Sequence, residues 1–167
     1  MKIYTILLMC GLLALNASCQ EDNDCCDGIP GNDEVFEFSI LDEAGNDLLD
    51  PATEGTLNTD NISILELKNG NYTVINNPRM DASGGYRIYA DTSPKKMRIF
   101  PGEGFIDGDF IVKKIILRWN DMEKDSVNMF LRKNANIQRL VRITYNEDEV
   151  WNSTQSEDGI RYFQVVK

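Results

Sequence analysis

The chain has 167 residues, with 27 Asp and Glu against 17 Lys and Arg, and its formal net charge at pH 7 is −10. It contains no histidine, which excludes Ser-His-Asp and Cys-His catalytic groups and imidazole metal ligands. Nucleic acids attract clustered Lys and Arg, so the acidic balance argues against a nucleic-acid partner.

The first 18 residues have the pattern of a signal peptide. Lys2 gives a positive start, and the apolar region of 13 residues from Ile3 to Leu15 is too short to span a bilayer, which takes roughly 20 as a helix. The stretch that ends in Cys19 resembles the lipobox of bacterial lipoproteins, although Asn16 stands where that pattern has leucine: Leu15-Asn16-Ala17-Ser18-Cys19. The resemblance implies cleavage before Cys19 and lipidation of this cysteine. The alternative is an ordinary secretory signal that is cleaved nearby.

An acidic linker follows over residues 19–34. Its first part, Gln20-Glu21-Asp22-Asn23-Asp24, resembles the export signal that directs Bacteroidota lipoproteins to the outer face of the outer membrane. The resemblance implies a lipid-anchored protein in the outer membrane that faces the cell exterior. The residues alone also fit a plain solvated linker, because a polar segment cannot bury enough apolar surface to order itself.

The cysteines agree with this division of the chain. Cys10 belongs to the signal peptide and Cys19 would carry lipid, which leaves Cys25 and Cys26 in the linker. No cysteine lies in residues 35–167, so no disulfide can stabilise the folded domain. We interpret Cys25 and Cys26 as incidental linker residues, without a C-x-x-C redox or zinc pattern.

Residues 35–167 form one predicted domain, whose hydrophobic period is mostly two, as in strands. Asn69-Gly70 between two such runs is a strong hairpin signal. The pattern predicts an all-β fold, an antiparallel β-sandwich of about 8–10 short strands with immunoglobulin-like or transthyretin-like architecture. The expected strands lie at 36–40, 62–67, 72–75, 86–90, 97–99, 115–119, 127–131, 140–145, 150–151 and 162–166.

One stretch allows a second interpretation. Between Gly108 and Gly159 there is neither glycine nor proline, and parts of it also fit helical spacing. We favour strands, because β-branched and aromatic residues flank both halves of the stretch.

Two motifs bracket most of this domain and resemble a group of small Bacteroidota surface lipoproteins. The first is Asp42-x-x-Gly45-x-Asp47-Leu48-Leu49-Asp50-Pro51, and the second is Tyr145-Asn146-x-x-x-Val150-Trp151. The resemblance implies an all-β domain without an assigned activity. Each motif also has a structural interpretation, as a loop after the first strand and a hairpin near the end of the chain.

Carboxylates are the remaining candidates for catalysis. They cluster at Asp107-Gly108-Asp109, at Asp121/Glu123/Asp125 and at Glu147-Asp148-Glu149. A glycosidase needs two carboxyls that face each other across a cleft, one of them with a raised pKa. All three clusters fall in predicted turns, where acidic residues serve solvation, so we expect no catalytic residues.

Metal and phosphate motifs are incomplete. Asp121, Glu123 and Asp125 match the first ligand positions of an EF-hand, but Ser126 and Arg132 replace the required glycine and glutamate, which leaves an irregular calcium loop as the open alternative. Pro101-Gly102-Glu103-Gly104 lacks the third glycine and the helix of a phosphate-binding loop. We therefore expect neither metal nor cofactor.

Aromatic side chains are the usual platform for carbohydrate binding by a sandwich, and Tyr89, Trp119, Tyr145 and Trp151 are the candidates. Trp119 has the parity of Ile115 and Leu117 and is expected inside; Tyr89 has the parity of Arg87 and Asp91 and is the preferred ligand-binding residue. In addition, Asp125-Ser126-Val127 resembles the O-glycosylation acceptor of exported Bacteroidota proteins, which implies modification of Ser126; a plain turn is the alternative.

Together these observations predict a lipid-anchored surface lipoprotein whose domain is a non-catalytic binding or accessory module for a glycan or protein ligand. Two alternatives remain. One is a polysaccharide-active enzyme that uses paired carboxylates, and the other is a pilus-type assembly subunit completed by strand addition.

Overall fold

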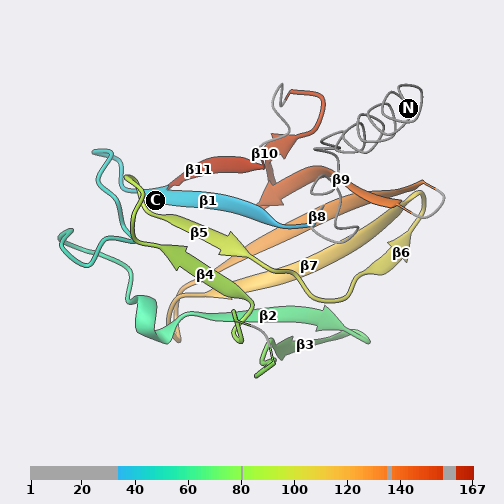
Figure 1. Ribbon diagram of the computed structural model, residues 1–167, viewed down its shortest axis with the longest axis horizontal. Helices are drawn as coiled ribbons and strands as arrows, with labels where there is room; N and C mark the ends of the chain where they lie inside the picture. Colours follow the sequence, from blue (N-terminus) through green and yellow to red (C-terminus); the bar gives the residue numbers. More distant parts are fainter. Residues whose placement is uncertain (1–33, 80, 135–136, 156–160) are drawn as a thin grey trace, which may run out of the picture. The chain divides into compact units, whose positions relative to one another are not determined.

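Two β-sheets form the part of the chain that the structure describes (Figure 1). The computed structural model describes residues 34–79, 81–134, 137–155 and 161–167. The strands are β1 (Phe36–Leu41), β2 (Ser63–Lys68), β3 (Asn71–Val74), β4 (Tyr86–Tyr89), β5 (Lys96–Ile99), β6 (Phe105–Asp107), β7 (Phe110–Arg118), β8 (Lys124–Asn134), β9 (Ile137–Tyr145), β10 (Asp148–Asn152) and β11 (Tyr162–Val166).

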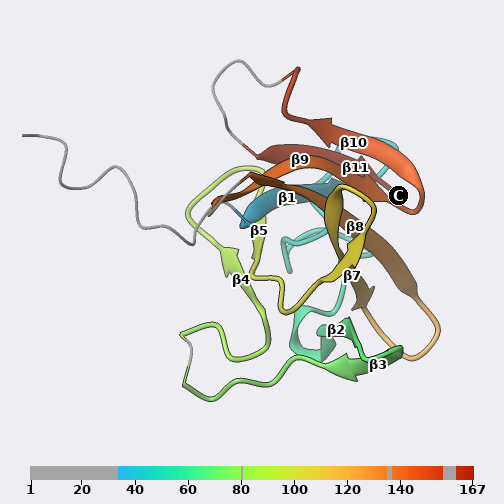
Figure 2. The same cartoon turned by 90° about the vertical axis from the view of Figure 1, so that its right-hand side faces the viewer.

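The smaller sheet has the strand order β11-β1-β5-β4, and the larger has the order β10-β9-β8-β7-β2-β3, with β6 beside β7. In these described sheets β1 and β11 are parallel, and the other pairs are antiparallel. Figure 2 shows the larger sheet curving from β10 to β3 past β1 and β5. The arrangement confirms the predicted β-sandwich, although the described residues hold eleven strands rather than eight to ten. Its immunoglobulin-like or transthyretin-like character stays a prediction.

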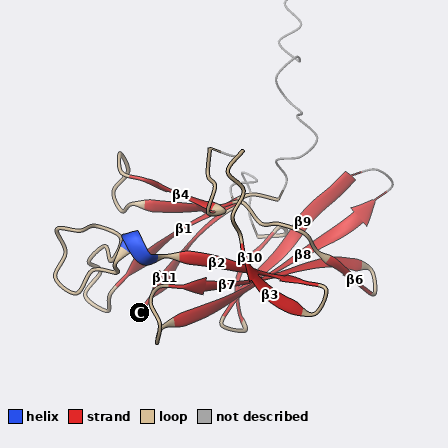
Figure 3. Ribbon diagram, turned by 90° about the horizontal axis from the view of Figure 1, so that it is seen from below, coloured by secondary structure: helices blue, strands red, loops and turns tan. Residues whose placement is uncertain are grey.

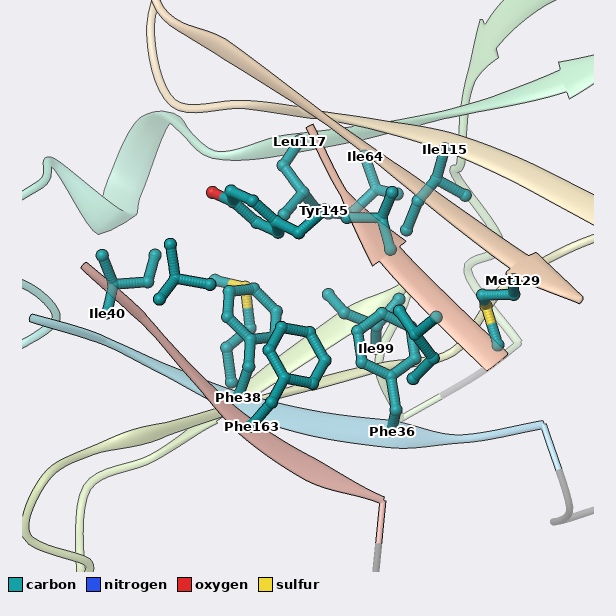
Figure 4. Packing of buried hydrophobic residues seen from close by; sticks show 14 of the residues in the cluster. Phe36, Phe38, Ile40, Ile64, Ile99, Ile115, Leu117, Met129, Tyr145 and Phe163 are labelled. Carbon is teal, nitrogen blue, oxygen red and sulfur yellow. The ribbon is translucent and has the colours of Figure 1, made fainter. Parts of the chain in front are cut away.

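The core lies between the two sheets and consists of side chains that alternate inward along each strand. Leu117 of β7 and Val127 of β8 are fully buried. On the opposite side Phe36, Phe38 and Phe163 stack with ring centroids 5.5 to 6.0 Å apart (Figure 4). Burying one such side chain contributes about 1.5–3 kcal/mol. Apolar burial therefore holds together a domain that has no cysteine after residue 26.

Two tight hairpins fix the strand register. Asn69 and Gly70 have φ of 51° and 79°, and Asn146 and Glu147 have φ of 49° and 77°. Positive φ at both central residues is typical of a type I′ turn, whose twist matches that of the paired strands. The Asn-Gly hairpin is thus confirmed, and the second turn forms in the same way without a glycine.

The stretch with two interpretations consists of strands. Residues 110–118, 124–134 and 137–145 form β7, β8 and β9, which are longer than expected. Among the described residues the one helical element is a 3₁₀ turn at Thr59–Asn61 (Figure 3). The strand β6 is missing from the sequence prediction, because its three residues are too few to show a period.

The first motif of the lipoprotein resemblance forms a hydrogen-bonded loop. Asp42 Oδ1 accepts a hydrogen bond from the N–H of Asn46 at 2.7 Å. Asp47 Oδ2 accepts one from the N–H of Lys95 at 2.6 Å, and Asp50 Oδ1 accepts one from Lys95 Nζ at 2.9 Å. These bonds tie the loop to the segment before β5, so the acidic residues of this motif have a structural role.

Candidate functional site

The predicted acidic clusters lie mainly where the sequence places them. Asp107 and Asp109 are exposed at the β6–β7 hairpin, and residues 147–149 are exposed at the β9–β10 hairpin. Asp121 is exposed in the loop between β7 and β8. Asp125 is the exception, and its assignment to a solvated turn is wrong.

Asp125 lies on β8 and is only 6% exposed, because the inward parity of Val127 extends back to it. Four donors converge on its carboxylate. Oδ2 accepts from Trp119 Nε1 at 2.5 Å, from the Tyr145 hydroxyl at 2.6 Å and from Lys167 Nζ at 2.5 Å; Oδ1 accepts from Asn146 Nδ2 at 2.7 Å. We call Asp125 and its four donors the Asp125 cluster. Asp125 lies near the start of β8 and Tyr145 at the end of β9, and the other three residues directly follow strands: Trp119, Asn146 and Lys167.

Ionisation states in this cluster are fixed by the surroundings. Burial disfavours the charged form of Asp125, but hydrogen bonds from Lys167, Tyr145, Asn146 and Trp119 outweigh it and hold the pKa of the carboxyl below its usual value. Burial and the adjacent Asp125 carboxylate raise the pKa of the Tyr145 hydroxyl far above its usual value. At neutral pH the Asp125 carboxyl is therefore ionised and the Tyr145 hydroxyl is protonated.

A pocket of about 270 Å³ opens beside this cluster and is lined by Asp125, Tyr145, Asp148 and Lys167, among others. It brings together two carboxylates from β8 and β10, as a glycosidase would require. A general acid needs a raised carboxyl pKa, however, and the shift of Asp125 has the opposite sign. Both oxygens of Asp125 are also bound by protein donors, which fits a structural role for the cluster better than catalysis.

The aromatic candidates are mostly interior. Trp119 is fully buried, which confirms its predicted position. Tyr145 and Trp151 are buried as well, at 5% and 8% exposure, so neither offers an open ring to a ligand. The more exposed ring of Tyr72, at 46% on edge strand β3, has no counterpart in the sequence prediction.

Tyr89 lies partly exposed on the outer face of the smaller sheet, as its parity predicts. Arg98 Cζ and Arg87 Cζ lie 4.8 and 5.8 Å from the centroid of its ring. Arg98 pairs with Glu37, and Lys96 Nζ lies 3.8 Å from the same carboxylate. The charges of this face are thus partly neutralised internally. Its ligand-binding role stays a prediction.

The outer face of the larger sheet carries a group of cations that the sequence analysis misses. Six basic side chains project outward from β7, β8 and β9, since their neighbours along each strand point into the core. We call this group the cationic face: Lys114, Arg118, Lys124, Arg132, Arg139 and Arg142. Within the described residues none of the six forms an ion pair, whereas Lys68, Lys95, Lys96, Arg98, Lys113 and Lys167 do.

Three of these cations lie over or near aromatic rings. Arg142 Cζ lies 3.9 Å from the centroid of the Phe130 ring, and Arg132 Cζ lies 5.9 Å from that of Phe110. The two rings contact each other edge to face, with centroids 6.2 Å apart. A guanidinium that is stacked on a ring keeps its in-plane N–H groups available for an external acceptor. Lys114 Nζ lies in the same way 5.6 Å from another ring, that of Phe105.

A second pocket, of about 370 Å³, lies at the end of this face. Ile106, Asp109, Phe110 and Arg132 line it. Its size falls in the range of small-molecule sites. Asp109 and Arg132 give it one charge of each sign, and it adjoins the cations rather than the Asp125 cluster.

The remaining predicted sites are a modification and an anchor. Ser126 lies on the outer side of β8, and its N–H donates to Asn146 Oδ1 at 2.8 Å. It is therefore part of a strand rather than a plain turn, and its glycosylation stays a prediction. Cys19, Cys25 and Cys26 lie outside the described residues.

The chain matches no protein-family model, no curated protein and no solved structure. Among the described residues no helix has the length and apolar character needed to cross a bilayer. The same residues contain no group of three or more Cys, Asp or Glu side chains that is arranged to hold a metal ion.

Proposed function

We propose that this protein is a lipid-anchored lipoprotein of the outer membrane that faces the cell exterior, and that its sandwich domain is a non-catalytic binding module. The anchor rests on the lipobox-like sequence at Cys19 and the acidic run that follows it. Acyl chains on this cysteine would hold the protein at the membrane without a spanning helix.

The single observation that supports binding is the cationic face. Its six cations form no ion pair within the described residues, although Arg118 Nε donates to Ser63 Oγ at 2.8 Å, so their positive charge can attract an external anion. Binding at such a face needs no cofactor and no catalytic residue.

The enzyme alternative has less support. The pocket beside the Asp125 cluster holds two carboxylates, but the one with a shifted pKa is held ionised rather than protonated. The pilus-type alternative needs a long open edge, whereas the described edge strands β3, β4, β10 and β11 have four or five residues each.

The anchor is tested by Cys19→Ala, with Cys25→Ala in the adjacent linker as the matched control. We expect Cys19→Ala to move the protein from the membrane pellet to the soluble fraction, and Cys25→Ala to leave it in the pellet. Membrane partitioning of Cys19→Ala equal to that of the wild type contradicts the lipoprotein proposal.

The binding proposal is tested on a glycan array with the full chain carrying Cys19→Ala. Specific binding that is lost when basic residues of the cationic face are replaced supports the proposed module. Loss of binding on Tyr89→Ala alone would assign the ligand to the smaller sheet. Release of sugar by the protein, abolished in Asp148→Asn, would favour the enzyme instead.

A further inference from the structure

We infer that the cationic face binds a linear polyanion, an acidic polysaccharide that presents carboxylate or sulfate groups along its length. This inference rests on the proposed binding function and names the chemical class of its ligand.

Like charges stand directly opposite one another on this face. Arg118 pairs in register with Lys124 across β7 and β8, and Arg132 pairs with Arg139 across β8 and β9. Cross-strand pairs of equal charge lower the stability of a sheet. An anion placed between the members of each pair would relieve this repulsion, so the face favours a ligand with repeated negative groups.

The two like-charge pairs are far apart along the strands. Lys124 and Arg132 are eight positions apart on β8, which corresponds to about 27 Å at the rise of an antiparallel strand. Lys114 and Arg142 lie on the flanking strands, between the ends of this span. A single small anion cannot reach both ends, whereas an extended chain can.

The side chains that lie between and around the cations also favour an anionic polymer as the ligand of the cationic face. The other outward positions are uncharged: Ser126 and Asn128 on β8, Thr144 on β9, and the apolar Val112 and Ile116 on β7. In the described sheet, acidic side chains border the face at Glu149 on edge strand β10 and at Asp107 on β6. Within the described strands the cationic face therefore carries no acidic side chain among its cations, and negative charge limits it at its margins.

Nucleic acids and membranes fit this face less well. Single-stranded nucleic acids stack their bases on open aromatic rings, but Arg142 lies over the ring of Phe130. Membrane-surface proteins insert exposed apolar side chains beside their cations. In the described part of the larger sheet the exposed large apolar side chains lie on the marginal strands, Tyr72 and Val74 on β3 and Phe105 and Ile106 on β6, and none lies on β7, β8 or β9.

The face of the smaller sheet provides an internal comparison. There Arg87 stands opposite Arg98, but Arg98 is paired with Glu37. The like-charge pair on that side is thus relieved within the protein. The cationic face has no such partner among the described residues, so an external anion would supply it.

The test compares dextran sulfate with neutral dextran, which share a backbone and differ in charge, and adds polygalacturonate as an acidic polymer that carries carboxylates. The full chain carrying Cys19→Ala is titrated by calorimetry with dextran sulfate, polygalacturonate and neutral dextran. Oligo(dT) and vesicles of anionic phosphatidylglycerol serve as the competing polyanions. We expect binding of dextran sulfate or polygalacturonate and none of neutral dextran, although the whole chain carries a charge of −10.

The variant Arg132→Gln/Arg142→Gln identifies the surface. We expect it to weaken polyanion binding by about tenfold or more and to reduce the slope of log K against log salt by about two. The control Arg79→Gln/Arg87→Gln removes the same charge from exposed positions elsewhere and should leave both quantities near those of the parent chain. Equal melting temperatures of the two variants show that both fold.

Three results overturn the inference: no binding of either acidic polysaccharide, equal losses in the two double variants, or tighter binding of oligo(dT) or of anionic vesicles. If the acidic polysaccharides fail but another ligand binds specifically on the array, the inference fails and the binding module stands. If nothing binds, both fail.

Discussion

Replacement of Asp125 by asparagine is the sharpest test of how this fold is held together. Asparagine has the shape of aspartate but offers one oxygen and an N–H₂ group instead of two acceptor oxygens. In the structure Trp119, Tyr145, Asn146 and Lys167 all donate to the carboxylate. The amide would therefore direct its own donors at other donors, and Lys167 would lose a buried counter-charge.

The size of the effect follows from these contacts. A hydrogen bond to a charged group contributes about 1.5–3 kcal/mol, and removal of one member of a buried ion pair costs about 3–5 kcal/mol. Glu123 lies 2.6 Å from Lys167 Nζ and keeps a partner for that cation, which places the expected loss near the lower end, at about 3 kcal/mol.

Urea unfolding followed by tryptophan fluorescence measures this loss, since Trp119 is itself part of the cluster. Asp121→Asn, an exposed substitution in the preceding loop, is the matched control and should change the unfolding free energy by less than about 0.5 kcal/mol. The wild type should also lose this contribution as the pH falls below 3.8, because the folded pKa of Asp125 lies below the usual carboxyl value of 3.8. An Asp125→Asn loss under about 1 kcal/mol would refute the account.

Two further predictions concern the hydrogen bond from Tyr145 to Asp125 and the close packing of Gly104 against β7. Tyr145→Phe should cost about 1–2 kcal/mol, and because the folded pKa of Tyr145 is raised above 10.0, the wild type should lose stability above pH 10.0 more steeply than this variant in alkaline urea titrations. Gly104→Ala would place a Cβ 2.7 Å from Ile111 Cγ2 and 3.0 Å from the Val112 carbonyl oxygen, and should lower the unfolding free energy by about 1–3 kcal/mol. Gly84→Ala, whose nearest neighbour is a tyrosine ring carbon at 3.3 Å, should cost less; equal melting temperatures for the two alanine variants would contradict the steric argument.

Local pattern predicts the strands well, since burial imposes a period of two. The inward position of Trp119 and the Asn69-Gly70 hairpin both follow from residues close in sequence. The position of Asp125 does not. Its partners Tyr145 and Lys167 are 20 and 42 residues away, and a carboxylate is placed in a core only when such distant donors converge on it.

The cationic face, like the Asp125 cluster, depends on contacts between residues that are distant in sequence, and local pattern does not predict them. The outward parity of Lys114, Arg118 and Arg142 can be deduced from their apolar neighbours, so each could be assigned to a surface. The sequence also shows 15 basic residues against 13 acidic ones from residue 79 to the end, which is nearly neutral in sum. The total does not show that the cations gather on one face, because strand order and register decide which outward positions are neighbours.

The proposed function depends on binding of an anionic ligand at the outer face of β7, β8 and β9. Two-dimensional amide NMR of the Cys19→Ala chain, titrated with a sulfated dextran oligosaccharide, maps the surface that binds. We expect shift changes that cluster at Lys114, Arg132, Arg142 and their strand neighbours and that fade as salt is raised. Changes confined to Tyr89 and the smaller sheet, or none at saturating ligand, would contradict binding at this face.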